Sequence, residues 1–219
     1  VAWQARHAAQ QRLYEAVTDY VRHGYNQALA AKQRHISFLM ILMQRLVTSS
    51  TAAIRTTLEK RLAVLEIPQP QAPLFEDTDT IEEWVELDGQ AQVDLAVQAS
   101  GWEKERAEVE LLLDLARETE AAGTDAKAEA LLELIYKLQQ EEGDPELKVL
   151  VFTEFVPTQA MLTSFMESRG FSVAILNGGM DLDARAKAQQ SFSRDVRLLI
   201  STDAGGEGLN LQFCHVVVN

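Results

Sequence analysis

The sequence contains one cysteine, Cys214, and therefore has no internal disulfide. Disulfides are usual in small secreted domains and rare in reducing compartments, so we expect an intracellular protein. Cys214 lies in the apolar run CHVVV. This setting predicts a buried thiol that packs as a small apolar side chain.

Long apolar runs are also missing. The richest one, from Ile36 to Leu42, is far shorter than the roughly 20 residues that cross a membrane. The N-terminal segment VAWQARHAAQQ has no apolar core of the kind that signal peptides carry. We therefore expect no membrane partner and a cytoplasmic location.

Basic residues are scarce outside the first third of the chain. Residues 1–65 carry nine Lys or Arg and three acids, whereas residues 66–146 carry five bases and 23 acids. The net charge of −13 would normally disfavour nucleic acid. Phosphate binding depends on local patches, however, so a charge distributed in this way excludes no nucleic-acid partner.

Helical periodicity dominates the first two thirds of the sequence. Residues 4–47 are predicted to be helical, with Gly24 as a weak point where the helix could break or kink. A second helix follows candidate N-caps at Ser49, Ser50 and Thr51 and ends before Pro68. Two further helices are predicted over 103–121 and 125–141, the second capped by Asp125.

Residues 67–102 are predicted to be an acidic linker between these helices. Seven acids and three prolines, with no basic residue, lie within 67–90, which we expect to be the most mobile part of the chain. A solvated connector is one interpretation of this segment. An acidic plug that imitates DNA phosphates is the other.

The pattern changes at Leu147. Four short apolar runs, LKVLVFT, FSVAIL, VRLLIS and CHVVV, alternate with helical segments that carry start and stop signals at Pro157, Gly170 and Asp181. This order predicts an α/β fold: a helical N-terminal part followed by a parallel sheet with helices on both faces. The predicted domains are helical 1–66, the linker 67–102, a helical connection 103–146, and the sheet 147–219.

Three loops follow the predicted strands, where open α/β sheets bind ligands. They are Thr153-Glu154-Phe155, Asn177-Gly178-Gly179, and the segment from Ser201 to Asn210. The third reads STDAGGEGLN, with two hydroxyls beside glycines that allow a ligand to approach the backbone. It therefore suits a phosphate backbone or a nucleotide.

Three segments in a fixed order carry a family resemblance. KVLVFTEF, NGGMDLDAR and LLISTDAGGEGLNLQFCHVVVN resemble the second RecA-like motor lobe of SWI/SNF-type, superfamily II ATP-dependent DNA translocases. DAKAEALLELI resembles the helix that introduces this lobe, and QQRLYEAVTDYV with LEKRL is similar to the segment joining the two lobes. The sequences of these segments are most similar to those of bacterial members, including the RapA-like branch.

The resemblance implies roles for individual residues. Contact with the nucleic-acid backbone is implied for Thr153, Arg185, Ser201 and Thr202. The second-lobe side of the ATP pocket is implied for Gly206, Glu207 and Gly208. The implied cofactors of the full-length protein are ATP and magnesium. Its implied partners are double-stranded DNA and RNA polymerase or another protein complex, at the bacterial nucleoid.

Structural roles are open for several of these residues. Arg185 could form a surface ion pair with Asp181 or Asp183. Thr153 could cap the end of its strand, and Glu207 could be merely exposed, since an acid beside DNA would be repelled.

Catalytic motifs are missing from this chain. It has no GxxxxGK[ST] phosphate loop and no acidic DExx box for magnesium. Phosphoryl transfer needs these groups together with a cationic side chain, so the chain alone is predicted to be inactive, with no catalytic or metal-binding residue. A stand-alone nucleotide- or nucleic-acid-binding module and a helical protein-interaction fragment are the alternative functions. The sequence preceding Val1 in the gene would distinguish them.

Overall fold

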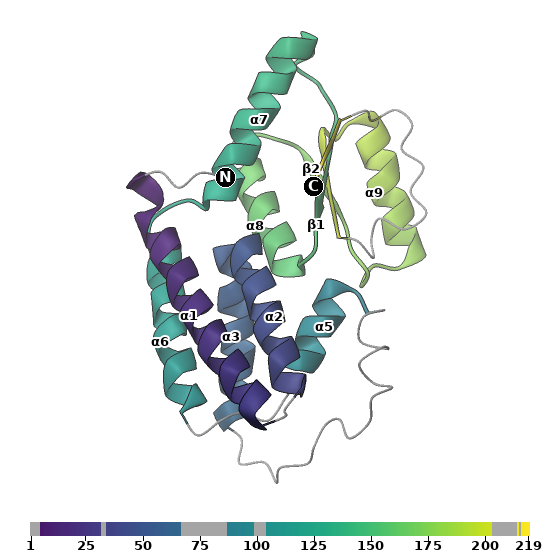
Figure 1. The fold of residues 1–219 in the computed structure, drawn as a ribbon. Helices are drawn as coiled ribbons and strands as arrows, with labels where there is room; N and C mark the ends of the chain where they lie inside the picture. The colour runs from purple at the N-terminus through teal and green to yellow at the C-terminus, as the bar shows by residue number, and fades with distance from the viewer. Residues whose placement is uncertain (1–4, 32–33, 67–86, 99–103, 203–213, 215) are drawn as a thin grey trace. The chain divides into compact units, whose positions relative to one another are not determined.

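The computed structural model describes residues 5–31, 34–66, 87–98, 104–202, 214 and 216–219 (Figure 1). The side chains of residues 29–31, 34 and 35 are outside this description. The chain divides into two compact units, residues 2–125 and residues 126–219. Each unit is described by itself below.

The first unit is helical. Its elements are η1 (Ala5–His7), α1 (Ala8–Ala31), α2 (Arg34–Ser49), α3 (Thr51–Glu66), α5 (Gly89–Ala96) and α6 (Glu105–Ala122). The helix does not break at Gly24, the weak point in the sequence, and α1 continues through this residue. A helical glycine costs only about 1 kcal/mol relative to alanine. The packing of α1 against α2 and α6 outweighs that cost.

The junction between α2 and α3 confirms the predicted N-cap. The Ser50 hydroxyl accepts a hydrogen bond from the Ala53 amide at 3.0 Å. Asp125 also serves this helix end, because its carboxylate accepts from the Thr51 amide at 3.2 Å and from the Gln10 side chain at 2.8 Å. The carboxylate predicted to cap the following helix thus contacts the N-terminus of α3, where free amides favour negative charge.

Helix α5 lies inside the segment predicted to be a linker, so that prediction is wrong for residues 89–96. Asp88 caps the helix by accepting from the Ala91 amide at 2.9 Å, and Val93 is buried. Gln92 accepts a hydrogen bond from Arg45 of α2 at 2.9 Å. Two of the acids here have structural roles, since Asp94 also pairs with Lys60. Residues 67–86 and 99–103 lie outside the described residues.

An ion pair is buried at the centre of the helical unit. Arg61 of α3 and Glu105 at the start of α6 are both fully buried, and two hydrogen bonds of 2.7 and 2.8 Å join them. Arg61 also donates to the Val97 carbonyl at 2.8 Å, and the Tyr20 hydroxyl of α1 donates to Glu105 at 3.0 Å. Burial, and then the Glu105 charge, raise the pKa of Tyr20 well above its usual value. The pair therefore joins α1, α3, α6 and the end of α5.

The second unit is a parallel sheet with helices. Its elements are α7 (Ala126–Glu142), β1 (Val149–Thr153), α8 (Val156–Glu167), β2 (Val173–Leu176), α9 (Leu182–Arg194), β3 (Leu198–Thr202) and β4 (Val216–Val218). The strand order is β2-β3-β1-β4, and each neighbouring pair is parallel. Pro157 lies in the first turn of α8, Gly170 has a φ of 83° after it, and Asp181 caps α9. The predicted fold class is confirmed.

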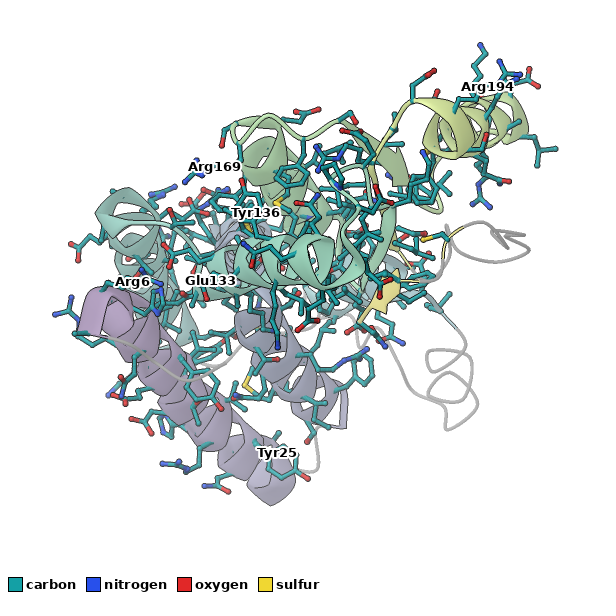
Figure 2. The ribbon with its side chains drawn as sticks, turned by 90° about the horizontal axis from the view of Figure 1, so that it is seen from above. Arg6, Tyr25, Glu133, Tyr136, Arg169 and Arg194 are labelled. Carbon is teal, nitrogen blue, oxygen red and sulfur yellow. The ribbon has the colours of Figure 1, made fainter. Side chains whose placement is uncertain are left out.

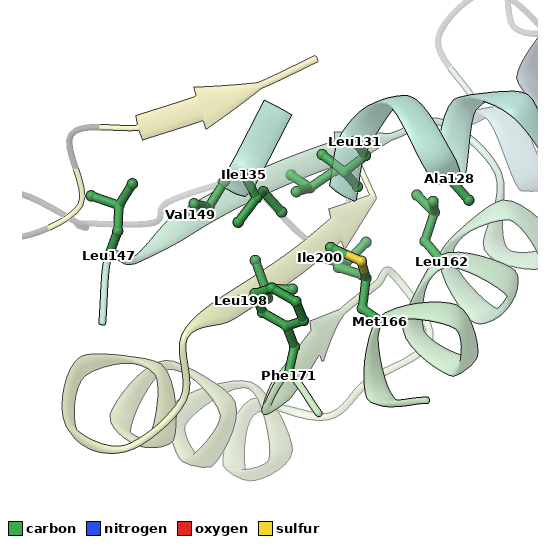
Figure 3. Packing of buried hydrophobic residues seen from close by; sticks show 11 residues of the cluster. Ala128, Leu131, Ile135, Leu147, Val149, Leu162, Met166, Phe171, Leu198 and Ile200 are labelled. Atoms are coloured by element: carbon green, nitrogen blue, oxygen red, sulfur yellow. The ribbon is translucent and has the colours of Figure 1, made fainter. Parts of the chain in front are cut away.

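Two apolar clusters cover the two faces of this sheet. On one face, side chains of α7 and α8 pack on alternate strand residues: Ala128, Leu131, Ile135, Leu162 and Met166 on Val149, Val151, Leu198 and Ile200 (Figure 3). On the other face, Phe192 of α9 packs on Leu150, Leu176 and Leu199. Both faces of the central strands are therefore dry, as expected for a parallel sheet.

We predict that removing one charge of the buried pair strongly destabilises the helical unit. Glu105→Gln leaves the Arg61 cation without its carboxylate and should lower the free energy of unfolding by about 3–5 kcal/mol. Urea unfolding followed by circular dichroism measures this. Arg106→Met is the control, because Arg106 pairs with Glu110 and Glu66 on the exposed surface and should cause little change. Equal losses in the two variants would contradict a structural role for the buried pair.

Candidate nucleic-acid interface at the carboxyl ends of the strands

Strand register brings the predicted contact residues to one edge of the sheet. Thr153 at the end of β1 lies opposite Thr202 at the end of β3, and Leu176 at the end of β2 lies opposite Ser201. Neighbouring strands are about 4.8 Å apart, so the last residues of β2, β3 and β1 form a row. The loops that were predicted to bind a ligand therefore leave the sheet side by side.

The hydroxyls of this row face two sides of the sheet. Thr153 and Thr202 continue the alternation that places Val151 and Ile200 under α7 and α8, whereas Ser201 faces the α9 side. Ser201 is fully buried, and its hydroxyl donates to the Thr202 carbonyl at 2.9 Å. The Ser201 side chain therefore braces the strand end. Thr153 is half-buried, and Thr202 is 5% exposed.

Arg185 reaches the same edge from α9. Its guanidinium donates to the Asn177 carbonyl, directly after β2, at 3.3 Å. The Asp181 carboxylate, which the sequence offered as an ion-pair partner for Arg185, accepts from the Ala184 amide at 2.7 Å as the N-cap of α9. The structure thus brings Arg185 together with the loop after β2, where the strand row ends.

The loop that Arg185 contacts is itself ordered by an asparagine. The Asn177 side-chain oxygen accepts from the Gly179 amide at 3.1 Å, and the Asn177 carbonyl accepts from the Met180 amide at 3.3 Å. These bonds form a tight turn in which an Asx side chain replaces a backbone acceptor. Arg185 is therefore held against a turn with a defined shape.

Gln159 is the residue of this edge that sequence reasoning missed. It lies on α8, is 2% exposed, and donates to the carbonyls of Leu176 and Ile200 at 2.8 Å each. Its side-chain oxygen accepts from the Asn177 amide group at 3.0 Å. A signal existed in the sequence, because Gln159 shares the buried stripe of Leu162 and Met166 at helical spacing. A polar residue on such a stripe needs buried partners.

The residues predicted to line the ATP pocket, Gly206, Glu207 and Gly208, lie outside the described residues. Cys214 is half-buried, its thiol donates to the Lys148 carbonyl at 3.4 Å, and burial raises the pKa of this thiol. The predicted burial of this thiol is therefore only partial.

Cations at the opposite, amino edge of the sheet have structural partners. Lys148, before β1, donates to the Phe192 and Val196 carbonyls at the end of α9, at 2.6 and 2.9 Å. The Arg197 guanidinium, before β3, stacks on the Phe171 ring at 4.8 Å. Arg169, after α8, stacks on the Phe165 ring at 4.7 Å (Figure 2 shows its place). Each of these three cations therefore contacts a helix end or an aromatic ring.

Within the described ranges, no three His, Cys, Asp or Glu side chains are grouped as metal ligands would be. None of the helices seen in those ranges is both long and apolar enough to cross a membrane.

The C-terminal unit matches a known domain family. The helicase conserved C-terminal domain covers residues 126–219, the same range that the structure separates as a compact unit. Residues 126–219 are a helicase C-terminal domain. Helix α7 therefore belongs with the sheet, whereas the sequence placed it in the helical connection 103–146.

Individual relatives support this identification. The uncharacterized ATP-dependent helicase YqhH of Bacillus subtilis is 29% identical over 182 residues, which are 83% of this chain and 25% of YqhH. The helicase domain of Pyrococcus furiosus Hef superposes with a TM-score of 0.53 at 14% identity, covering 95% of this chain and 46% of that one. The C-terminal part of the Fun30 ATPase domain gives 0.51 at 16% identity, covering 96% and 70%. These two likenesses confirm the RecA-like fold, and this chain spans a quarter of YqhH.

We predict that the Ser201 hydroxyl of the helicase C-terminal domain stabilises the fold. Ser201→Ala removes a buried hydrogen bond and should lower the free energy of unfolding by about 0.5–1.5 kcal/mol. Urea unfolding of the 219-residue chain measures it. Ser193→Ala is the control, since the Ser193 hydroxyl donates to a helix carbonyl on the exposed surface. Unchanged stability in Ser201→Ala, with weaker binding of nucleic acid, would mean that this hydroxyl faces the ligand instead.

Proposed function

We propose that this chain is part of an ATP-dependent DNA translocase of the SWI/SNF type. Its helicase C-terminal domain would contribute backbone contacts to DNA and the second-lobe side of the ATP pocket. One observation carries the proposal: Thr153, Thr202 and the loop held by Arg185 end at a single edge of the parallel sheet. Strand-end hydroxyls and a guanidinium suit phosphates, which carry position and no base identity.

The place of Arg185 in the fold supports this assignment. At the amino edge, Lys148 and Arg197 stabilise a helix end and an aromatic ring. At the carboxyl edge, the Arg185 guanidinium is held against the turn after β2 by its hydrogen bond to the Asn177 carbonyl. Ligands of open α/β sheets bind at the carboxyl edge.

Sequence resemblance supports the proposed substrate, partners and cofactors. Double-stranded DNA is the proposed nucleic acid, and RNA polymerase or another protein complex is the proposed protein partner in a bacterial cytoplasm. ATP and magnesium are the proposed cofactors of the whole protein. Their phosphate loop and acidic ligands would come from a part of the protein outside this chain, since the sequence has neither motif.

The first prediction from the proposed function concerns Thr202 in the full-length protein. Thr202→Val keeps the side-chain volume and removes the hydroxyl, so the DNA concentration needed for half-maximal ATPase stimulation should rise by roughly tenfold. Thr163→Val is the control, because the Thr163 hydroxyl donates to the Gln159 carbonyl within α8. The shift should be independent of base sequence, and RNA should be tested beside DNA. If DNA stimulates the ATPase of both variants equally, the Thr202 hydroxyl does not contact DNA.

The second prediction concerns Arg185. If its guanidinium neutralises one phosphate, Arg185→Gln should reduce the salt dependence of DNA binding by about one ion. Arg194→Gln, at the far end of the same helix and exposed, should leave the salt dependence unchanged. DNA binding titrated at several salt concentrations measures both. An unchanged slope for Arg185→Gln would assign Arg185 a purely structural role.

The third prediction is that the 219-residue chain alone hydrolyses no ATP, with or without DNA. Phosphoryl transfer needs a phosphate cradle and metal ligands that the chain lacks. Phosphate release from a preparation that has been freed of contaminating ATPase is the measurement. DNA-stimulated release would refute the assignment of catalysis to another part of the protein.

A further inference from the structure

Among the described residues of the helicase C-terminal domain, Gln159 is the most buried polar side chain that bridges separate elements. It comes from α8, on one face of the sheet, and contacts the ends of two strands and the loop beyond one of them. Its amide group has two donor hydrogens and one oxygen, and the three contacts use all three functions. The geometry is therefore that of a fully satisfied buried bridge.

The two acceptors of Gln159 lie on neighbouring strands. Leu176 is the last residue of β2 and pairs with Ser201 of β3. Ile200 is the residue immediately before Ser201. One amide nitrogen that bonds both carbonyls fixes the separation of these strands close to their carboxyl ends. A one-residue slip of β2 would break this bridge and reverse the faces of its side chains.

The third contact extends the bridge to the candidate interface. Gln159 accepts from the Asn177 side chain, whose own oxygen forms the turn at Gly179. The Asn177 carbonyl accepts from Arg185. A continuous chain of hydrogen bonds thus runs from the end of β3, through Gln159 and Asn177, to the guanidinium of Arg185.

We propose that Gln159 is a positioning residue for nucleic-acid binding: it holds the loop after β2 against the end of β3, so that Arg185 meets the nucleic-acid backbone at this edge. This inference rests on the proposed function of that edge. Gln159 itself is buried beneath the interface and touches no ligand. Its effect on binding passes through Asn177 and Arg185.

A purely structural role for Gln159 predicts a different result. In that case its loss would lower stability and leave the affinity of the folded protein for DNA unchanged. Leu162→Ala is a matched control, because Leu162 is buried one turn further along α8 and packs in the apolar cluster between the helices and the sheet. The two variants separate loss of packing from loss of loop position.

The test compares Gln159→Met, Gln159→Glu and Leu162→Ala in the full-length protein. Methionine keeps the length of the side chain and removes its hydrogen bonds. Glutamate turns a carboxylate toward the Leu176 and Ile200 carbonyls, so it should be the more damaging change. The DNA concentration for half-maximal ATPase stimulation is measured for each variant relative to its own maximal rate. We expect a rise of about threefold to tenfold for Gln159→Met, and no rise for Leu162→Ala.

A double variant tests the route of the effect. If Gln159 acts through Arg185, Gln159→Met combined with Arg185→Gln should bind DNA no more weakly than Arg185→Gln alone. Additive losses, or an equal rise in Leu162→Ala, would overturn the proposal. If Arg185→Gln and Thr202→Val leave DNA binding unchanged, the proposed function of the edge fails, and the inference about binding fails with it.

Amide exchange distinguishes these two failures. The Gly179 and Met180 amides, which bond to Asn177, should exchange faster in Gln159→Met and at the original rate in Leu162→Ala. This readout needs no DNA. Faster exchange without weaker DNA binding would overturn the link to nucleic acid, whereas unchanged exchange would overturn the positioning role itself.

Discussion

The parallel pairing of β1 with β3 is the constraint on which the rest of the C-terminal domain depends. Their five paired residues place two apolar faces back to back, one for α7 and α8 and the other for α9. The same register brings Thr153 and Thr202 to a common edge. A shift of one residue would turn buried valines and leucines toward the wrong helices and separate the two threonines, so the core and the interface are fixed together.

Buried polar groups give each unit its geometry. In the helical unit, the Arg61–Glu105 pair joins helices that are distant in sequence. In the sheet unit, Gln159 joins α8 to two strand ends and a loop. Burying such a group costs free energy unless its hydrogen-bond partners are in place. These groups therefore favour the correct packing over its alternatives. The relevance of Gln159 to function follows from where its partners lie.

The sequence predicted the parts of the structure that depend on local chemistry. The four β-branched runs, Ser50 as an N-cap and Asp181 at the start of α9 were all recognisable, because each is specified within a few residues. Helix α5 was misread because burial against other helices outweighs acidic composition. The position of Gln159 on a buried helical stripe signals a need for partners, but those partners lie 17 to 41 residues away, so local sequence does not identify them. The predicted pocket residues 206–208 stay a prediction.

The proposed function requires nucleic acid to lie against the carboxyl edge of this sheet. A photo-crosslinking amino acid placed at Arg185 or at Glu146, in the full-length protein, tests it most directly. Arg185 contacts the loop after β2 at the carboxyl edge, whereas Glu146 pairs with Arg197 at the amino edge. With radiolabelled duplex DNA, the account predicts a crosslink from position 185 that excess unlabelled duplex abolishes, and none from position 146. Equal crosslinking from both positions, or crosslinking from position 146 alone, would contradict it.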